Sequence, residues 1–133
     1  MKSKIVLLFL LLLCIAFVSQ EKNTFNYPKY FPNPVYQFEN KQTNDAKTEL
    51  GRALFYDPIL SLDNSISCAS CHNPYNAFAH VDHNLSHGIN DKPGNRNAPV
   101  LFNLAWHKSF MWDGAINHID VQALAPISHP DEM

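Results

Sequence analysis

The segment Cys68-Ala69-Ser70-Cys71-His72 decides how this chain of 133 residues is interpreted. Two thiols stand three residues apart, and an imidazole follows the second thiol directly. This C-x-x-C-H spacing is typical of c-type haem attachment, in which both sulfurs form thioethers with one porphyrin. The adjacent histidine then binds the iron as its proximal ligand. The segment therefore predicts one covalent haem c held by Cys68, Cys71 and His72.

Two other uses of paired cysteines fit the sequence less well. A zinc site requires a further pair of soft ligands, and the remaining cysteine, Cys14, lies within an apolar run that we expect to be removed. A thioredoxin-like redox pair is expected within a βαβ unit, and the sequence shows no such context. We therefore interpret Cys68 and Cys71 as haem-binding thiols.

Residues 1–19 are typical of a secretory signal peptide. Lys2 and Lys4 precede an apolar run over 5–18, and small and polar residues follow it. The run has 14 residues, whereas a membrane-spanning helix needs about 20; a short membrane anchor is the alternative. Cleavage near Ser19 would place the protein in the periplasm with no stable membrane insertion. Export and the haem motif support each other, because c-type haem is attached outside the cytoplasm.

The charge balance argues against a nucleic-acid partner. Cleavage would remove Lys2 and Lys4 and leave eight basic residues against twelve acidic ones. Nucleic-acid-binding domains concentrate Lys and Arg on one surface, and the sequence contains no such basic cluster. We therefore expect no binding to nucleic acid.

Residues 20–43 predict an extended lead-in. Pro28, Pro32 and Pro34 remove backbone donors and restrict their neighbours, which disfavours a helix. The aromatic residues of this segment are expected on the domain surface or against a neighbouring domain.

Residues 44–133 predict an all-α, cytochrome c-like haem domain. The first helix is expected over 44–56, capped by Asn44 or Asp45 and stopped by Pro58. A short helix over 68–72 would place the two thiols and the imidazole around one haem edge. Residues 73–98 are expected to be rich in loops, and helical segments are expected again over 99–106 and 118–125.

The residue on the second axial side of the iron determines what a haem protein does. His87 and Met111 are the candidates downstream of the motif. A histidine would give a low-potential centre or a closed form of a catalytic one, whereas a methionine would indicate a simple electron carrier. The other histidines are interpreted as surface or hydrogen-bonding residues: His80, His83, His107, His118 and His129.

Five segments surround the haem motif in a fixed order: LGRALFYDPILS (50–61), SISCASCHNP (65–74), RNAPVLFNLAW (96–106), FMWDGAINHIDVQALAPI (110–127) and DEM (131–133). Together they strongly resemble the bacterial di-haem cytochrome c peroxidase/MauG family. In that family the matching N-terminal domain holds the peroxidatic haem, and a C-terminal domain with a second C-x-x-C-H holds the electron-transferring haem. The resemblance implies that this chain is the N-terminal half, as a fragment or a truncated copy, without the second-haem domain.

The resemblance also implies roles for individual residues. His87 matches the distal ligand that leaves the iron when the partner haem is reduced. Gln122 and Glu132 match the active-site pair on the distal side, and Trp112 matches the tryptophan between the two haems. Asn97 matches the residue that supplies an oxygen to an inter-domain calcium.

Taken alone, these residues have ordinary interpretations. Glu132 would be a solvated terminal acid, Gln122 a helix surface residue, Trp112 a core residue and Asn97 a turn residue. One position departs from the family pattern, because Ala115 follows the WDG motif where many members have Arg. A cation near a haem propionate is then missing or supplied by another residue, for which Arg52 and Arg96 are available.

Three functions follow from this reading. The first is a cytochrome c peroxidase that reduces hydrogen peroxide to water with electrons from a small cytochrome or copper protein, with a homodimer possible at full length. The second is a non-catalytic, single-haem electron carrier. The third is a MauG-like haem oxidase. His87, Gln122 and Glu132 together favour the first over the second.

Overall fold

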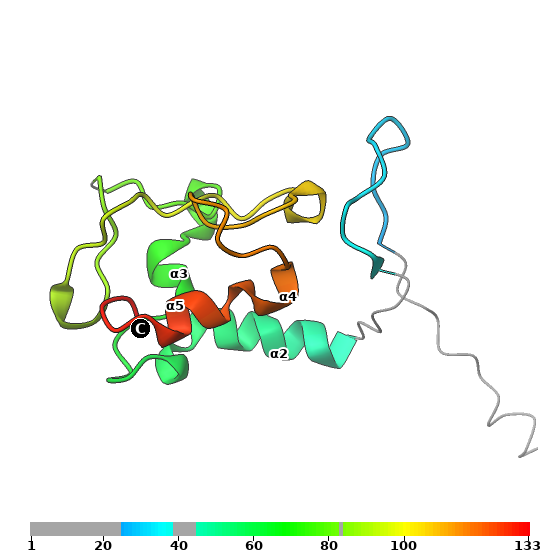
Figure 1. The fold of residues 1–133 in the computed structure, drawn as a ribbon. Coiled ribbons are helices and arrows are strands. Elements are labelled where there is room, and N and C mark those ends of the chain that lie inside the picture. The colour runs from blue at the N-terminus through cyan, green and yellow to red at the C-terminus, as the bar shows by residue number, and fades with distance from the viewer. Residues whose placement is uncertain (1–24, 39–44, 83) are drawn as a thin grey trace, which may run out of the picture.

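The computed structural model describes residues 25–38, 45–82 and 84–133. Short helices and long connections follow one another in this part of the chain (Figure 1). The order is α2 (Asp45–Tyr56), η2 (Pro58–Leu60), α3 (Cys68–Cys71), η3 (Pro74–Asn76), η4 (Ile89–Asp91), η5 (Leu104–Trp106), α4 (Ile119–Gln122) and α5 (Leu124–Ser128). The described residues form isolated bridges but no strand, which confirms the helical class for this part of the chain.

The longest helix of the described residues, α2, is confirmed where the sequence predicted it. Asp45 places a negative charge in the first turn, which the helix dipole favours. The helix ends at Tyr56 because Asp57 leaves the helix and Pro58 begins η2. The Asp57 side chain accepts a hydrogen bond from the backbone N–H of Ile59 at 2.9 Å, so it caps η2. The other predicted cap, Asn44, lies outside the described residues.

The two later helical predictions are only partly correct. Residues 99–103 are not helical, and the helical turn η5 begins at Leu104. Asn103 has a φ of 56° and lies in the left-handed region, which prevents a helix from running through it. The predicted segment over 118–125 divides at Ala123 into α4 and α5, and α5 continues to Ser128.

The described part of the lead-in packs against η5. The indole N–H of Trp106 donates to the carbonyl of Pro32 at 2.8 Å, and the backbone N–H of Tyr36 donates to the carbonyl of Ala105 at 3.0 Å. Phe25 and Phe31 place their rings 5.9 and 5.3 Å from that of Trp106. The lead-in is therefore held at one end of the domain, beside η5 (Figure 1). Residues 1–19, the predicted signal peptide, lie outside the described residues.

Tyr36 makes the packing of the lead-in against the rest of the domain dependent on pH. Its hydroxyl donates to Asp120 Oδ1 at 2.8 Å, and burial, followed by this hydrogen bond and the nearby charge, raises the pKa of Tyr36 to about 12. The stabilisation is therefore complete below the ordinary pKa of about 10 and is lost as the pH rises through about 12. Tyr36→Phe should lower the free energy of unfolding by about 1 kcal/mol at neutral pH, and the difference should vanish at high pH. Urea unfolding across pH, with exposed Tyr75→Phe as the control, measures this.

The hydrophobic core of the described residues is very small. Its buried apolar side chains are Ile89, Phe110 and Met133, and no residue of α2 is buried. Leu50 and Leu124 are exposed on their helices at 59% and 61%. Within the described ranges, no helix is both long and apolar enough to cross a membrane. So little buried apolar area makes the folded state only marginally stable, and an additional apolar body packed inside the domain would stabilise it.

Candidate haem site

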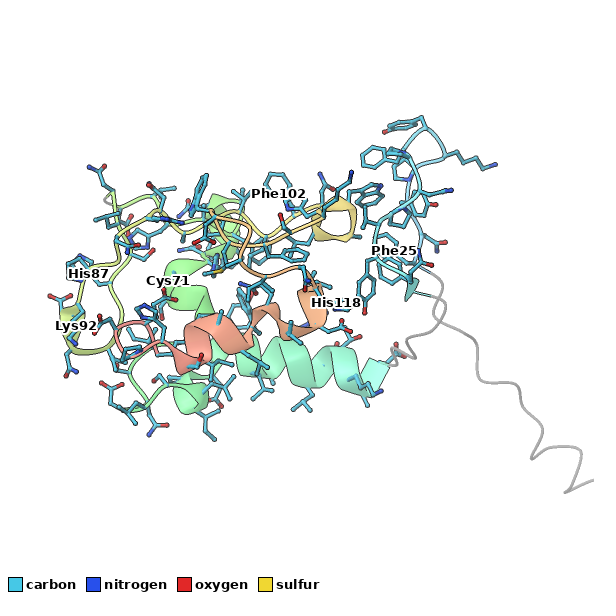
Figure 2. All side chains as sticks on the ribbon, viewed as in Figure 1. Phe25, Cys71, His87, Lys92, Phe102 and His118 are labelled. Atoms are coloured by element: carbon cyan, nitrogen blue, oxygen red, sulfur yellow. The ribbon has the colours of Figure 1, made fainter. Side chains whose placement is uncertain are left out.

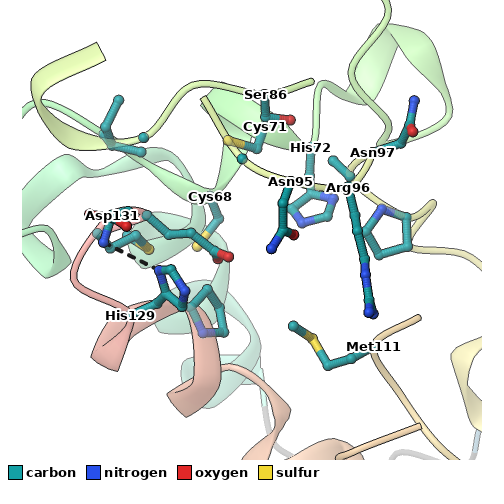
Figure 3. A pocket seen from close by; sticks show the side chains of 18 of the residues that line it. Cys68, Cys71, His72, Ser86, Asn95, Arg96, Asn97, Met111, His129 and Asp131 are labelled. Carbon is teal, nitrogen blue, oxygen red and sulfur yellow. Dashed lines mark hydrogen bonds between the residues drawn. The ribbon is translucent and has the colours of Figure 1, made fainter. Parts of the chain in front are cut away.

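A cavity of about 480 Å³ lies beside α3 (Figure 3). Its volume falls in the usual range for ligand and cofactor sites. Its walls come from α3, from the loops before and after residue 95, from α4 and α5 and from the C-terminal turn. The lining residues include Cys68, Cys71, His72, Gly88, Arg96, Asn97, Met111, Trp112, Gln122 and Glu132. Most of the predicted site residues therefore meet in one place.

Local hydrogen bonds explain why the haem motif folds as a single helical turn. The backbone N–H of Ser67, just before the helix, donates to Ser70 Oγ at 3.1 Å, which is half of a capping box. The backbone N–H of His72 donates to the carbonyl of Cys68 at 2.9 Å and closes the turn. The predicted helix over 68–72 is thus observed as α3, with His72 as its C-cap. The turn presents both thiols and the imidazole to the cavity.

The His72 ring is oriented by a residue that the sequence did not point to. Its Nδ1 lies 2.9 Å from the carbonyl oxygen of Phe78, so Nδ1 carries the proton and donates it. Ala77 and Phe78 both have positive φ, at 54° and 58°, and this double left-handed turn brings the carbonyl back to His72. In the neutral imidazole this hydrogen bond makes Nε2 the nitrogen that is able to bind a metal. The only available signal was the nearby Asn-Pro turn, which does not specify a carbonyl.

The two cysteines are free thiols. Burial raises the pKa of both Cys68 and Cys71, so both are protonated at neutral pH. The Cys71 thiol also points toward the carbonyl oxygen of His87, 3.8 Å away. Two S–H groups and one imidazole nitrogen lining the same cavity are the donor set that covalent haem c requires. The residues present therefore fit the group.

Two pairs of the predicted site residues contact one another. Gln122 Nε2 donates to Met111 Sδ at 3.5 Å, and the indole N–H of Trp112 donates to the backbone carbonyl of Asn97 at 2.7 Å. Trp112 is 63% exposed, so it lies at the open side of the cavity and not in a core. The contact with Trp112 involves only the backbone oxygen of Asn97, and the side-chain oxygen of Asn97 takes no part in it.

His87 lies apart from this group. It is not among the residues that line the cavity, and in Figure 2 it lies near the outer loop that carries Lys92. Its Nδ1 is 2.5 Å from Asp91 Oδ1, and its side chain is 38% exposed. Met111, the other axial candidate, does line the cavity. The structure therefore brings Met111 into the site and leaves the His87 imidazole outside it.

Arg96 is the better placed of the two candidate replacement cations. It lines the cavity, and its Nη1 lies 3.3 Å from Asp113 Oδ2. A hydrogen bond from the backbone N–H of Ala115, followed by the charge of Arg96, holds the pKa of Asp113 below its usual value. Arg52 instead pairs with Glu49 on α2 at 3.5 Å and does not line the cavity. A positive charge is thus present at the cavity although Ala115 carries none.

Comparison with known proteins gives one consistent result. Residues 45–133 match the family model described as di-haem cytochrome c peroxidase. The chain is 38% identical over 113 residues to the methylamine utilization protein MauG of Methylorubrum extorquens, covering 84% of this chain and 30% of that protein. It is 34% identical over 106 residues to the cytochrome c551 peroxidase of Pseudomonas aeruginosa, covering 79% and 30%.

A solved structure supports the same relationship. The crystal structure of a MauG-like protein associated with microbial copper homeostasis superposes with a TM-score of 0.71 at 34% identity. The match covers 82% of this chain and 31% of the other. The chain spans less than a third of the length of these relatives. The extent of the family match and these identities show that the chain belongs to the di-haem cytochrome c peroxidase family, which includes MauG.

Proposed function

We propose that this chain is the peroxide-reducing haem domain of a longer exported oxidoreductase. The observation that carries the proposal is that the C-x-x-C-H turn, Gln122 and Glu132 all line the same cavity. An electron carrier needs the haem-binding turn and an axial ligand, but it needs no carboxylate and amide beside them. We therefore place the haem, its proximal ligand His72 and the acid–base group in one site.

The residues of the chain supply proton transfer and orientation. When bound to Cys68, Cys71 and His72, the haem would supply a redox-active iron. Cleavage of the O–O bond of hydrogen peroxide requires a proton to move from one peroxide oxygen to the other, which then leaves as water. The Glu132 carboxylate accepts that proton and returns it, as general base and then acid. The Gln122 amide holds the peroxide by hydrogen bonding, and exposed Trp112 lies where electrons would arrive.

The remaining assignments concern the full-length protein. Residues 1–19 would direct export to the periplasm, 20–43 would form the lead-in, and 44–133 would form the haem domain. Electrons would come from a small cytochrome or copper protein through a second haem, and the full-length protein would form a homodimer. Asn97 would donate an oxygen to calcium. Among the described residues, no group of three or more His, Cys, Asp or Glu could hold a metal ion.

The experiment that tests the function uses the haem-loaded full-length protein. Hydrogen peroxide is added together with a reduced small c-type cytochrome, and oxidation of that cytochrome is followed by its absorbance. Peroxide-dependent oxidation with two equivalents of cytochrome per peroxide is expected. Haem-loaded protein that oxidises no donor, with either a cytochrome or a small copper protein, would contradict a peroxidase. Oxidation of an organic or protein substrate instead would identify a MauG-like oxidase.

One observation favours the second function, a single-haem electron carrier. Met111 lines the cavity, whereas the His87 side chain lies outside it and contacts Asp91. A methionine on the distal side of the iron would block peroxide and raise the potential of the haem. The identity of the axial ligand therefore separates the two functions.

Exchanging the axial candidates one at a time decides between them. As the distal ligand of the resting peroxidase, His87 should be required for the low-spin ferric spectrum. His87→Ala is then expected to give a high-spin spectrum, whereas Met111→Leu leaves the spectrum unchanged. Absorption and electron paramagnetic resonance spectra of the loaded protein measure the spin state. The opposite pattern would assign Met111 as the ligand and support the electron carrier.

A further inference from the structure

The turn that carries Glu132 packs directly on Gly88. A Cβ atom at position 88 would lie 2.0 Å from the carbonyl oxygen of Asp131 and 2.7 Å from the Cα of Glu132. The φ of Gly88 is −97°, which any residue adopts. The requirement for glycine is therefore one of space, because a side chain at this position would push the backbone of Glu132 away.

Gly88 belongs to a short loop with its own internal hydrogen bonds, which we call the 86–94 loop. The N–H of Gly88 donates to the carbonyl of Lys92 at 2.8 Å, and the N–H of Gly94 donates to the carbonyl of Ser86 at 2.8 Å. Ile89, at 3% exposure, anchors the loop in the small core. The loop therefore offers a defined surface to the turn that rests on it.

An ion pair joins the same two segments at a second point. Lys92 Nζ contacts Asp131 Oδ1, and both side chains are about half exposed. Asp131 directly precedes Glu132, and its own N–H donates to His129 Nδ1 at 3.2 Å. The hydrogen bond from Lys92 holds the pKa of the Asp131 carboxyl below its usual value. At neutral pH the Asp131 carboxyl is therefore ionised and can pair with Lys92.

The far side of the turn is also held. Met133 is buried at 7% exposure, and its carbonyl accepts a hydrogen bond from the N–H of Leu62 at 2.5 Å. The N–H of Glu132 donates to the carbonyl of His129 at 3.2 Å. Both neighbours of Glu132 in the chain, Asp131 and Met133, are thus held in place, and Glu132 lines the cavity.

We propose that Gly88 and Lys92 are positioning residues for Glu132: the glycine provides the space for the Glu132 backbone, and the Lys92–Asp131 pair fixes the turn against the 86–94 loop. The proposal rests on the proposed function only for its catalytic consequence. Neither residue touches the peroxide, and both act through the position of the carboxylate. A misplaced catalytic group loses rate without losing the ability to bind substrate.

The first measurement follows the turn itself in the full-length protein. Exchange of the backbone amide hydrogens of residues 129 and 131–133 is compared in wild type, Lys92→Met and Lys92→Arg, with Lys108→Met as the control. Lys108 does not line the cavity. Exchange should rise about two- to fivefold in Lys92→Met, as expected for a half-exposed ion pair, and return to wild-type rates in Lys92→Arg. Equal exchange in Lys92→Met and wild type would overturn the role of the ion pair.

The second measurement follows peroxide turnover in the same loaded proteins. Lys92→Met should lower kcat about two- to fivefold with an unchanged KM, and Lys92→Arg should restore it.

Gly88→Ala should lower kcat about 100-fold at full haem content. Gly51→Ala is its matched control, because a Cβ there meets nothing within 4 Å. Faster amide exchange in Lys92→Met with an unchanged kcat would overturn the positioning role. A wild-type protein that does not turn over peroxide would overturn the proposed function, and the comparison of exchange rates would still be valid. If Gly88→Ala fails to bind haem, the Lys92 variants decide the question.

Discussion

The double variant Cys68→Ala/Cys71→Ala is expected to lose covalent haem completely. Both thiols line the same cavity as His72, and no other described residue is a cysteine. Without the sulfurs no thioether forms, and the haem would have no covalent link to the chain that survives denaturation. Soret absorbance of the purified protein and haem staining after denaturing electrophoresis measure this. A haem-stained band from the double variant would contradict the assignment of these thiols.

Loss of the haem is expected to unfold much of the domain as well. The described residues bury only Ile89, Phe110 and Met133 among their apolar side chains, while a cavity of about 480 Å³ faces the haem-binding turn. A group that binds only the folded state stabilises it, so removing the haem removes that contribution. Circular dichroism should show lower helix content in the double variant.

A matched control lies within the same turn. Ser70→Ala keeps both thiols and removes only the hydroxyl that accepts the hydrogen bond of the Ser67 N–H. It should retain full haem content and lose about 1 kcal/mol of stability, which is typical of a helix cap. Haem loss in Ser70→Ala equal to that of the double variant would mean that the turn, and not the thiols, is responsible.

The features that the sequence predicted well are those fixed by near neighbours in the chain. The helix Asp45–Tyr56 follows from its cap and from Pro58, and the turn at Cys68–Cys71 follows from residues three positions apart. The prediction of a helix over 99–103 was wrong, because the left-handed conformation of Asn103 overrides the helical pattern of this segment. That conformation depends on how the chain is routed and leaves no clear trace in the sequence.

The contacts that position the site were not predictable, because they join distant segments. The carbonyl of Phe78 reaches His72 only through two left-handed residues, and Gly88 reaches Glu132 across more than forty positions. A glycine in a loop usually indicates a turn, whereas here it permits close backbone approach. The residues alone left both His87 and Met111 open as axial ligands, and the family resemblance favoured His87; the structure adds that Met111 lines the cavity and His87 does not.

Glu132→Gln is expected to lower peroxide turnover by about 100- to 10,000-fold, the usual contribution of a general acid–base group. The amide has nearly the shape of the carboxylate but cannot accept and return a proton at neutral pH. Haem content and the resting spectrum should not change, because Glu132 does not hold the haem in this proposal. Steady-state kcat and KM of the loaded full-length protein, together with its haem content, measure the effect.

The control for Glu132→Gln is Glu49→Gln, which makes the same chemical change on α2. Glu49 is exposed and pairs with Arg52, and it does not line the cavity. Its turnover should equal that of wild type. A Glu132→Gln variant that turns over as fast as Glu49→Gln would remove Glu132 from the mechanism, and the carboxylate would then be only a solvated acid near the mouth of the cavity. Because the Lys92–Asp131 pair is proposed to act only through Glu132, Lys92→Met introduced into Glu132→Gln should cause no further loss of kcat.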